Sequence, residues 1–356
     1  MKELKALLAW GGILALVLGT GLGEARTAKP KKVFIVASYE RGNVCGQPQE
    51  DGVIAALQDA GFKLGEDVII YRFYMDTKRT YTTPEQIEER GRIALEKIRE
   101  TSPDVVVTLD DNAAKTVMLS LVGSKTPVVF SGMNGQPEDY NKKRHFMESR
   151  ERPGGNVTGV YEKLHLIRSL KVMKAVIPGL KKVLAISDYS PTGQALIKQF
   201  EKELQGETPP VAFEVTRARD FSHYKEIIHK VNGDSEIGAI YPVALRLEAD
   251  GKTYTAPEIF RWTIKNCRKP GMAVNYFFAK LGLFGGAAVD FRAMGYQAGM
   301  KVVEILKGRP AGEIPIEDAK RYAIVFNIAR AKELGIEIPA EILGAADIIY
   351  KEILPR

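Results

Sequence analysis

The sequence predicts an α/β fold in which two lobes, each built on a doubly wound parallel sheet, are joined by a hinge. Two runs of alternating apolar strands and amphipathic helices, similar in length and order, indicate the two lobes. Between the runs lies the stretch 152–160, which contains one proline and three glycines; the glycines give the backbone the freedom that a crossing segment needs. The chain of 356 residues is long enough for two domains that each bury a core.

The first run contains four buried strands, each predicted from a continuous apolar stretch: 31–38, 68–74, 104–109 and 127–130. The helix after the first strand is expected to begin at Pro48 and end at Gly61, because proline suits a first helical turn and glycine a helix end. Thr83 and Gln86 form a capping box that opens the second helix. A third helix is expected over 112–121. Strict alternation of these elements predicts a parallel sheet.

The second run repeats this order of elements without repeating the sequence. Its strands are predicted over 183–187, 211–215, 237–241 and 272–276. Its helices are predicted over 164–177, after the cap Ser190-Pro191, over 221–231, and after a second capping box formed by Thr255 and Glu258. The second lobe is therefore expected to hold its own parallel sheet.

A long helix follows, over 291–307, with Asp290 as its cap. Gly295 and Gly299 are four residues apart and so lie on one face of this helix. Glycine costs about 1 kcal/mol inside a helix. Two glycines on one face therefore predict a close approach to another backbone.

Three stretches carry a family resemblance: PGGNVTGV at 153–160; GGAAVD at 285–290 with GYQAG at 295–299 and ILKGRP at 305–310; and NIARAKELGIEIP at 327–339. In spacing and order they resemble a family of bacterial ABC-importer substrate-binding proteins with the type I periplasmic-binding fold. The likeness covers nearly all of the chain after Lys31. Some members of that family look like binders of aromatic amino acids. Here the segment 131–134 replaces the acidic Asp-Pro turn that is usual after the fourth strand.

The resemblance implies a three-segment hinge, because in this family the helix at 291–307 returns to the first lobe and the strand at 322–327 goes back to the second. The expected division is an N-terminal lobe of 31–155 plus 283–318 and a C-terminal lobe of 156–282 plus 319–356. The resemblance also implies a small-molecule ligand and a partner, the permease of an ABC importer in the membrane. We expect the chain to be a monomer.

The first 25 residues predict a cleaved secretory signal, since Lys2 and Lys5 precede a short apolar run that ends in small residues. An uncleaved membrane anchor is the alternative. With a signal, the mature protein is periplasmic or otherwise extracytoplasmic. The net charge of +7 is spread along the chain without a basic stripe, so no nucleic-acid partner is expected. Cys45 and Cys267 are expected to be separate thiols, because a bridge would lock the two lobes together.

The ligand site of an open parallel sheet lies beyond the carboxyl ends of its strands. That rule selects the candidate ligand-binding residues Tyr39, Asp110, Asn112 and Asn134 in the first lobe, Tyr161 in the hinge, and Asp188, Tyr189, Tyr241 and Asn275 in the second lobe. Tyrosine, which also occurs at position 276, offers an apolar face and a polar tip. Each carboxylate could instead cap a helix; for the pair Asp110 and Asp111, one cap would suffice.

Chemically, these residues favour an amino acid or a similar small zwitterion. Aspartates would bind its ammonium, and the helix amino ends at Asn112 and Thr192 would attract its carboxylate. The sequence holds no nucleophile elbow or phosphate-binding loop, and its four histidines lack a zinc spacing, so no catalytic residue, metal or cofactor is expected. The predicted function is an exported solute-binding protein for an ABC importer. The alternatives are a ligand-sensing partner of a membrane signalling receptor and, less favoured, an α/β enzyme.

Overall fold

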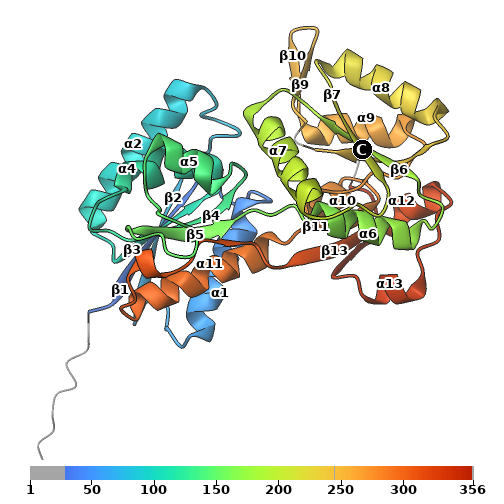
Figure 1. Ribbon diagram of the computed structural model, residues 1–356. Helices are drawn as coiled ribbons and strands as arrows, with labels where there is room; N and C mark the ends of the chain where they lie inside the picture. Colours follow the sequence, from blue (N-terminus) through green and yellow to red (C-terminus); the bar gives the residue numbers. More distant parts are fainter. Residues whose placement is uncertain (1–28, 244, 355–356) are drawn as a thin grey trace, which may run out of the picture.

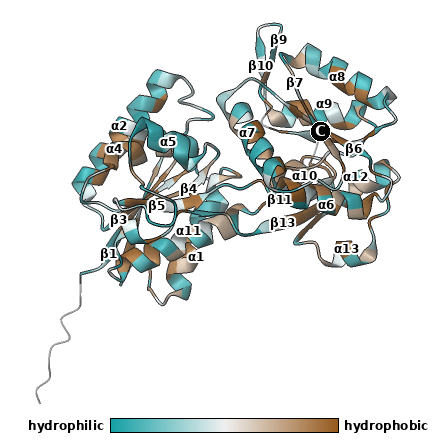
Figure 2. Cartoon of the chain, in the orientation of Figure 1, coloured by the Kyte–Doolittle hydropathy of each residue, from teal (hydrophilic) through white to brown (hydrophobic). Residues whose placement is uncertain are grey.

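The computed structural model describes residues 29–243 and 245–354, and the predicted signal at 1–25 lies outside these residues. The described chain forms two α/β lobes side by side, connected by strands that run between them (Figure 1). Hydrophobic residues concentrate on the strands at the centre of each lobe and hydrophilic residues on the outer faces of the helices (Figure 2). The fold class predicted from the sequence is confirmed. In the described part of the chain, no helix has the length and apolar character needed to span a membrane.

The first lobe is built on a six-stranded, all-parallel sheet in the order β12-β5-β4-β3-β1-β2. Its strands are β1 (Lys31–Ala37), β2 (Val68–Tyr74), β3 (Val105–Leu109), β4 (Val128–Met133), β5 (Val157–Tyr161) and β12 (Glu317–Asp318). Its helices are α1 (Gly46–Asp59), α2 (Pro84–Thr101), α3 (Asp110–Ala113), a π-helical turn (Ala114–Met118), α4 (Leu119–Leu121), α5 (Pro137–Lys143), α11 (Phe291–Leu306) and a 3-10 turn (Ala311–Glu313). The short helix α5 was not predicted, and the helix expected over 112–121 begins at Asp110 instead.

The second lobe contains two three-stranded sheets, β7-β6-β8 and β11-β13-β14, and a small hairpin, β9-β10. The strands are β6 (Lys182–Ser187), β7 (Ala212–Arg217), β8 (Ile237–Pro242), β9 (Leu247–Ala249), β10 (Lys252–Tyr254), β11 (Gly285–Val289), β13 (Tyr322–Asn327) and β14 (Ile348–Tyr350). The helices are α6 (Leu166–Val176), α7 (Pro191–Gly206), α8 (Phe221–Gly233), α9 (Ala256–Asn266), α10 (Tyr276–Lys280), α12 (Ile328–Glu333) and α13 (Ala340–Gly344).

The strand predicted over 272–276 is wrong as a regular strand. Its segment lies where a fourth strand would, between β8 and β11, but it makes only isolated bridges there, such as Met272 with Gly285. The chain turns into α10 at once, because the Asn275 side chain accepts a hydrogen bond from the N–H of Phe278 at 3.0 Å and caps that helix. The segment therefore joins the two sheets of the lobe without extending a ladder.

Two of the predicted lobe boundaries differ from the observed strand pairing. The segment β5, assigned to the C-terminal lobe by the division at 155/156, pairs with β4 in the sheet of the first lobe. The segment β11, assigned to the N-terminal lobe by the division at 282/283, pairs with β13 in the second lobe. A glycine-rich sequence locates a crossing only roughly, because backbone freedom serves a strand that is packed closely as well as a bend.

The close approach predicted for the long helix is confirmed. A Cβ atom built on Gly295 would lie 2.1 Å from the backbone oxygen of Gln49, and one on Gly52 would lie 2.2 Å from the oxygen of Arg292. Helices α11 and α1 thus touch backbone to backbone on one side of the first sheet. This contact fixes the position of Gln49, which is fully buried.

Candidate ligand-binding site

The carboxyl end of β3 carries a buried carboxylate that is only half hydrogen-bonded. Asp110 is 2% exposed, and its Oδ1 accepts a hydrogen bond from Gln49 Nε2 at 3.1 Å. Its Oδ2 is buried and has no hydrogen-bond partner among the described residues. The backbone of Asp110 has φ of +67°, in the left-handed region that non-glycine residues seldom adopt. A strained backbone holding an unpaired buried charge is typical of a binding site.

Glu162 lies just beyond β5 and presents a second buried carboxyl to the same edge of the sheet. Its side chain is 5% exposed, and the hydrogen bonds that hold the residue involve its backbone: the N–H donates to Met133 O, and the C=O accepts from Gln199. Burial raises the pKa of Glu162 well above its ordinary value, and the charges of Asp110 and Asp111 raise it further. Burial likewise raises the pKa of Asp110, to about 7. The charge of Asp110 therefore acts on Glu162 at this edge of the sheet.

Lys78 provides positive charge at this edge. The residue follows β2, is exposed, and its Nζ lies 3.7 Å from the centre of the Tyr39 ring. Its charge lowers the pKa of both Asp110 and Glu162, against the effect of burial. Of the predicted residues, Tyr39 and Asp110 are thus brought together, with Lys78 and Glu162 beside them. The carboxyl-end rule would have found Lys78 had it been applied to β2 as well.

Asp111 and Asn134 hold the loop after β4. The Asp111 carboxylate accepts hydrogen bonds from the backbone N–H and side-chain amide of Asn134, at 3.3 and 3.0 Å, and also from the N–H of Gly135 and the hydroxyl of Tyr140. Neither aspartate caps its helix. Both carboxylate oxygens of Asp111 therefore accept hydrogen bonds within the protein, whereas Asp110 has one oxygen without a partner. The side-chain amide of Asn134 is likewise bonded within the protein.

The two helix amino ends expected to attract a carboxylate are partly occupied by serine hydroxyls. Ser38 Oγ accepts from the N–H of Ala113 at 2.8 Å, and Ser190 Oγ accepts from the N–H of Gly193 at 3.1 Å. The Asn112 side chain donates to Thr77 Oγ1 at 2.9 Å, which ties α3 to the loop after β2. Lys78 is consequently a better partner for a ligand carboxylate than either helix end.

Tyr161 lies at the junction of the lobes and is buried. Its hydroxyl accepts hydrogen bonds from Gln136 of the first lobe and from Gln199 of α7 at 2.8 Å, and it donates to Asn134 O at 3.4 Å. With one donor and two lone pairs, this hydroxyl is fully used. Tyr161 therefore joins the lobes to each other rather than offering a free polar tip.

The second-lobe candidates do not gather around a common point. Tyr241 is fully buried and stacks on Phe200 with ring centres 5.5 Å apart, so it belongs to the core of the lobe. Tyr189 is 55% exposed and lies beside Arg217. Asn275 caps α10. Half-buried Tyr276 packs edge-on against Phe291 of α11, with ring centres 5.9 Å apart, and so lies against the first lobe.

Asp188 is buried and its carboxylate is saturated within the second lobe. Oδ1 accepts from the N–H of Ser190 at 3.0 Å and from its hydroxyl at 2.5 Å, and Oδ2 accepts from the N–H of Arg246 at 2.8 Å. These bonds join the loop after β6 to the loop after β8. The geometry indicates a structural role for this carboxylate.

Asp188→Ala is expected to lower the free energy of unfolding by roughly 2 kcal/mol, because it leaves buried donors unpaired. This corresponds to a melting temperature about 4 to 8 °C lower for lobes of this size. Thermal denaturation followed by circular dichroism measures the change. Glu226→Ala, at an exposed position of α8 in the same lobe, is the control and should stay within about 0.5 kcal/mol of the parent. An Asp188→Ala protein as stable as this control would contradict the structural role.

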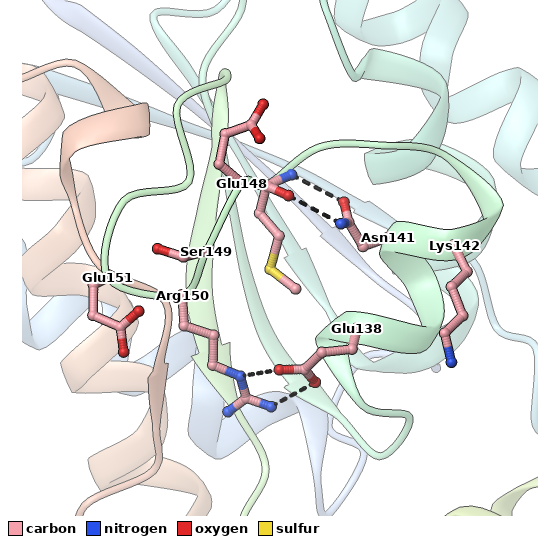
Figure 3. Close-up of a pocket in the computed structure, with 8 residues that line it drawn as sticks. Glu138, Asn141, Lys142, Glu148, Ser149, Arg150 and Glu151 are labelled. Carbon is pink, nitrogen blue, oxygen red and sulfur yellow. Dashed lines mark hydrogen bonds and ion pairs between the residues drawn. The ribbon is translucent and has the colours of Figure 1, made fainter.

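A separate surface hollow of about 520 Å³ lies between α5 and the loop at 147–151 (Figure 3). Arg150 dominates its wall and is already paired, with both oxygens of Glu138 and, at 2.7 Å, with Asp318 of β12. Asn141 is bonded to the backbone of Met147. These pairs tie α5 and β12 to the loop at 147–151. The hollow is thus less suited to a polar ligand than the edge that carries Asp110.

Both cysteines are free thiols, as predicted. The described residues contain no group of three or more His, Cys, Asp or Glu side chains arranged to hold a metal ion.

The family model described as ABC transporter substrate binding protein matches residues 47–349. A curated relative, named tyrosine-binding protein, from Clostridioides difficile (strain R20291), is 22% identical over 286 residues, covering 80% of this chain and 76% of that protein.

Solved structures show the same fold. A substrate-binding protein with adhesive properties from Clostridium difficile, in its ligand-free, open form, has a TM-score of 0.70 and 16% identity, covering 90% of this chain and 100% of that chain. A Streptococcus pneumonia ABC domain in complex with L-Trp has a TM-score of 0.65 and 18% identity, covering 90% of this chain and 99% of that chain.

Proposed function

We propose that this chain, which belongs to the family of ABC transporter substrate-binding proteins, captures an amino acid or a similar small zwitterion between its lobes and delivers it to an ABC importer. The family assignment rests on a model match over more than half of the chain. The capture takes place outside the cytoplasm, where substrate-binding proteins of importers work. Binding, release to a permease and export are the parts that we propose.

The observation that carries the proposal is the unpaired oxygen of Asp110. A buried carboxylate oxygen without a partner costs free energy in the ligand-free protein, and a ligand ammonium would remove that cost. Lys78 supplies a complementary charge for a ligand carboxylate, and the Tyr39 ring beneath it adds an apolar surface. An ammonium, a carboxylate and a small organic body are the parts of an amino acid.

The names of similar proteins support the same ligand class. One relative is a tyrosine-binding protein, and one protein of the same fold was solved with L-Trp. The lobe junction also suits capture, because Gln199 of the second lobe already bonds to Tyr161 and Glu162. A ligand that reached from Asp110 to the second lobe would favour closure around this junction.

The proposal is tested by thermal denaturation of the purified protein with the twenty amino acids and with short peptides. A ligand that binds only the folded protein stabilises it by about 2.7 kcal/mol at a hundredfold excess over the dissociation constant. For lobes of this size, the melting temperature should then rise by roughly 5 to 10 °C. A member that shifts the midpoint in this way, and that is recovered chemically unchanged, supports capture.

A panel in which no amino-bearing compound shifts the midpoint would overturn the proposed ligand class. Delivery is tested separately, by uptake of the identified compound, in radiolabelled form, into the native host. Deleting the gene should abolish high-affinity uptake. Unchanged uptake would leave capture in place and remove the transport role.

A further inference from the structure

We infer that the captured solute carries a second cationic nitrogen, so that the ligand is a basic amino acid rather than a neutral amino acid. This inference rests on the proposed function and narrows it. The relatives with printed ligand names are described with tyrosine and tryptophan, both neutral zwitterions. The buried acids at the site in this chain outnumber the single ammonium that a neutral zwitterion carries.

The first step is a count of the acids that remain available. Asp111 is used by the loop after β4, as its bonds to Asn134 show. Asp110 keeps one oxygen without a partner, and Glu162 is held through its backbone while its carboxyl is buried. Glu40, half-buried after β1, has a further buried oxygen, Oε2, without a partner among the described residues. At least two carboxyls, Asp110 and Glu162, therefore face the site from different strands.

The second step is the positive charge that opposes them. Lys78 is the base whose charge acts on both Asp110 and Glu162. A neutral amino acid brings one ammonium and one carboxylate, and its carboxylate would take Lys78 as partner. One ammonium would then remain for two buried acids. Because an uncompensated buried charge is costly, one of these acids would stay protonated, as the raised pKa of Glu162 favours, and its capacity to bind a cation would go unused.

A second cationic nitrogen on the ligand removes this imbalance. One nitrogen pairs with Asp110 at the end of β3, and the other pairs with Glu162 at the end of β5. These strands are separated by β4 in the sheet, so the two acids lie on neighbouring but distinct positions of one edge. β3 and β5 are two strand spacings apart, about 10 Å. Two nitrogens joined by an aliphatic chain can reach carboxyls on both strands, whereas a single ammonium can pair closely with only one of them.

The test compares L-lysine with L-norleucine, which has the same carbon chain but lacks the side-chain ammonium, and with L-tyrosine. Isothermal titration calorimetry of the full mature protein measures each dissociation constant. L-lysine should bind about tenfold or more tightly than L-norleucine, the ratio expected from one additional charge-assisted hydrogen bond in a buried site. Glu162→Gln, which keeps the shape of the side chain, should reduce this ratio to about threefold or less. Cadaverine has the two nitrogens of L-lysine but no carboxylate. The difference between its dissociation constant and that of L-lysine therefore measures what the pairing of Lys78 with the carboxylate contributes.

The outcomes distinguish the proposed capture of an amino acid from the inferred second cationic nitrogen. L-Norleucine or L-tyrosine binding as tightly as L-lysine would overturn the second cationic nitrogen and leave amino-acid capture intact. If the ratio of the dissociation constants of L-norleucine and L-lysine is unchanged in Glu162→Gln, Glu162 does not contact the side-chain ammonium, and the inference is also overturned. Failure of every amino-bearing probe would overturn the proposed function itself. A single cooperative circular-dichroism melt of Glu162→Gln, with a midpoint no lower than that of the parent, establishes that the variant is folded.

Discussion

Asp110→Asn is expected to abolish the ligand-induced rise in melting temperature and, at the same time, to raise the melting temperature of the ligand-free protein at pH 8. Loss of a buried charge-assisted contact should weaken binding about a hundredfold, the effect of removing roughly 3 kcal/mol. Asparagine suits the test, because it preserves the acceptor for Gln49 Nε2 and tolerates the positive φ of this position. The loss of ligand binding and the gain in ligand-free stability both result from replacing the unpaired oxygen of Asp110.

The gain in ligand-free stability follows from the pKa of Asp110. Burial raises that pKa to about 7, the charge of Lys78 lowers it, and the charge of Asp111 adds to the rise. A carboxyl whose pKa is higher in the folded state than in the unfolded state binds more protons when folded, so its contribution to stability is full below about pH 4 and is lost as the pH rises to about 7. At about 1.4 kcal/mol per pKa unit, this loss is roughly 4 kcal/mol.

The parent should therefore become less stable between about pH 4 and pH 7, more steeply than Asp110→Asn. The difference between the two proteins should be largest at pH 8 and small at pH 4. Glu162, whose pKa is also raised, contributes a slope in the same direction, and this slope is smaller in the variant because the charge of Asp110 no longer raises that pKa. Urea denaturation at a series of pH values measures these curves. Parallel curves for parent and variant would show that Asp110 is not a strained buried acid.

Asp111→Asn is the matched control, since it makes the same chemical change at the next residue. Its carboxylate accepts hydrogen bonds from Asn134, Gly135 and Tyr140. Replacing one oxygen by an NH₂ group puts a donor against donors, so this variant should be destabilised across the whole pH range. A stabilised Asp111→Asn would mean that the simple removal of negative charge from this edge, rather than the unpaired state of Asp110, explains the first result.

Local signals in the sequence predicted most of the fold. The capping box of Thr83 and Gln86 marks the start of α2 correctly, with the Gln86 N–H bonded to Thr83 Oγ1 at 3.3 Å. The strand at 68–74 has the predicted bounds. Such elements are predictable because a cap or an apolar run acts within a few residues. The segment 272–276 was not, because Asn275 ends the strand in favour of a helix, and the apolar pattern alone does not distinguish these outcomes.

The grouping of residues at the proposed site was easier to predict on the first lobe than on the second. Tyr39 and Asp110 were expected to lie together because a parallel sheet brings the carboxyl ends of its strands to one edge. Lys78 lies on the same edge but was not among the predicted residues. Glu162 was not predicted either, because its segment was assigned to the hinge. The roles of Asp188 and Tyr241 depend on partners far away in the sequence, Arg246 and Phe200. Spacing within the chain carries no information about such partners.

Gly295→Ala is expected to be the most destabilising of the single substitutions considered. The added Cβ would lie 2.1 Å from the backbone oxygen of Gln49 and 2.5 Å from its Cα, so relief requires moving the backbone of α1 or α11. Overpacking of this kind costs roughly 3 kcal/mol or more even after the gain of about 1 kcal/mol that alanine brings to a helix interior. The melting temperature should fall by about 6 to 12 °C.

The same substitution should also weaken ligand binding, because Gln49 is the residue that holds Asp110. Its Nε2 donates to Asp110 Oδ1, and its Oε1 accepts from Ser131 Oγ at 2.7 Å. Displacement of α1 moves this amide and frees the carboxylate to rotate. Gly233→Ala is the control: it stands in the last turn of α8, where a Cβ meets no atom within 4 Å, and its melting temperature should stay within about 2 °C of the parent. If the melting temperature of Gly295→Ala were the same as that of this control, the contact between α1 and α11 would be looser than the structure shows. A Gly295→Ala protein that is destabilised but binds as tightly as the parent would separate the helix contact from the site.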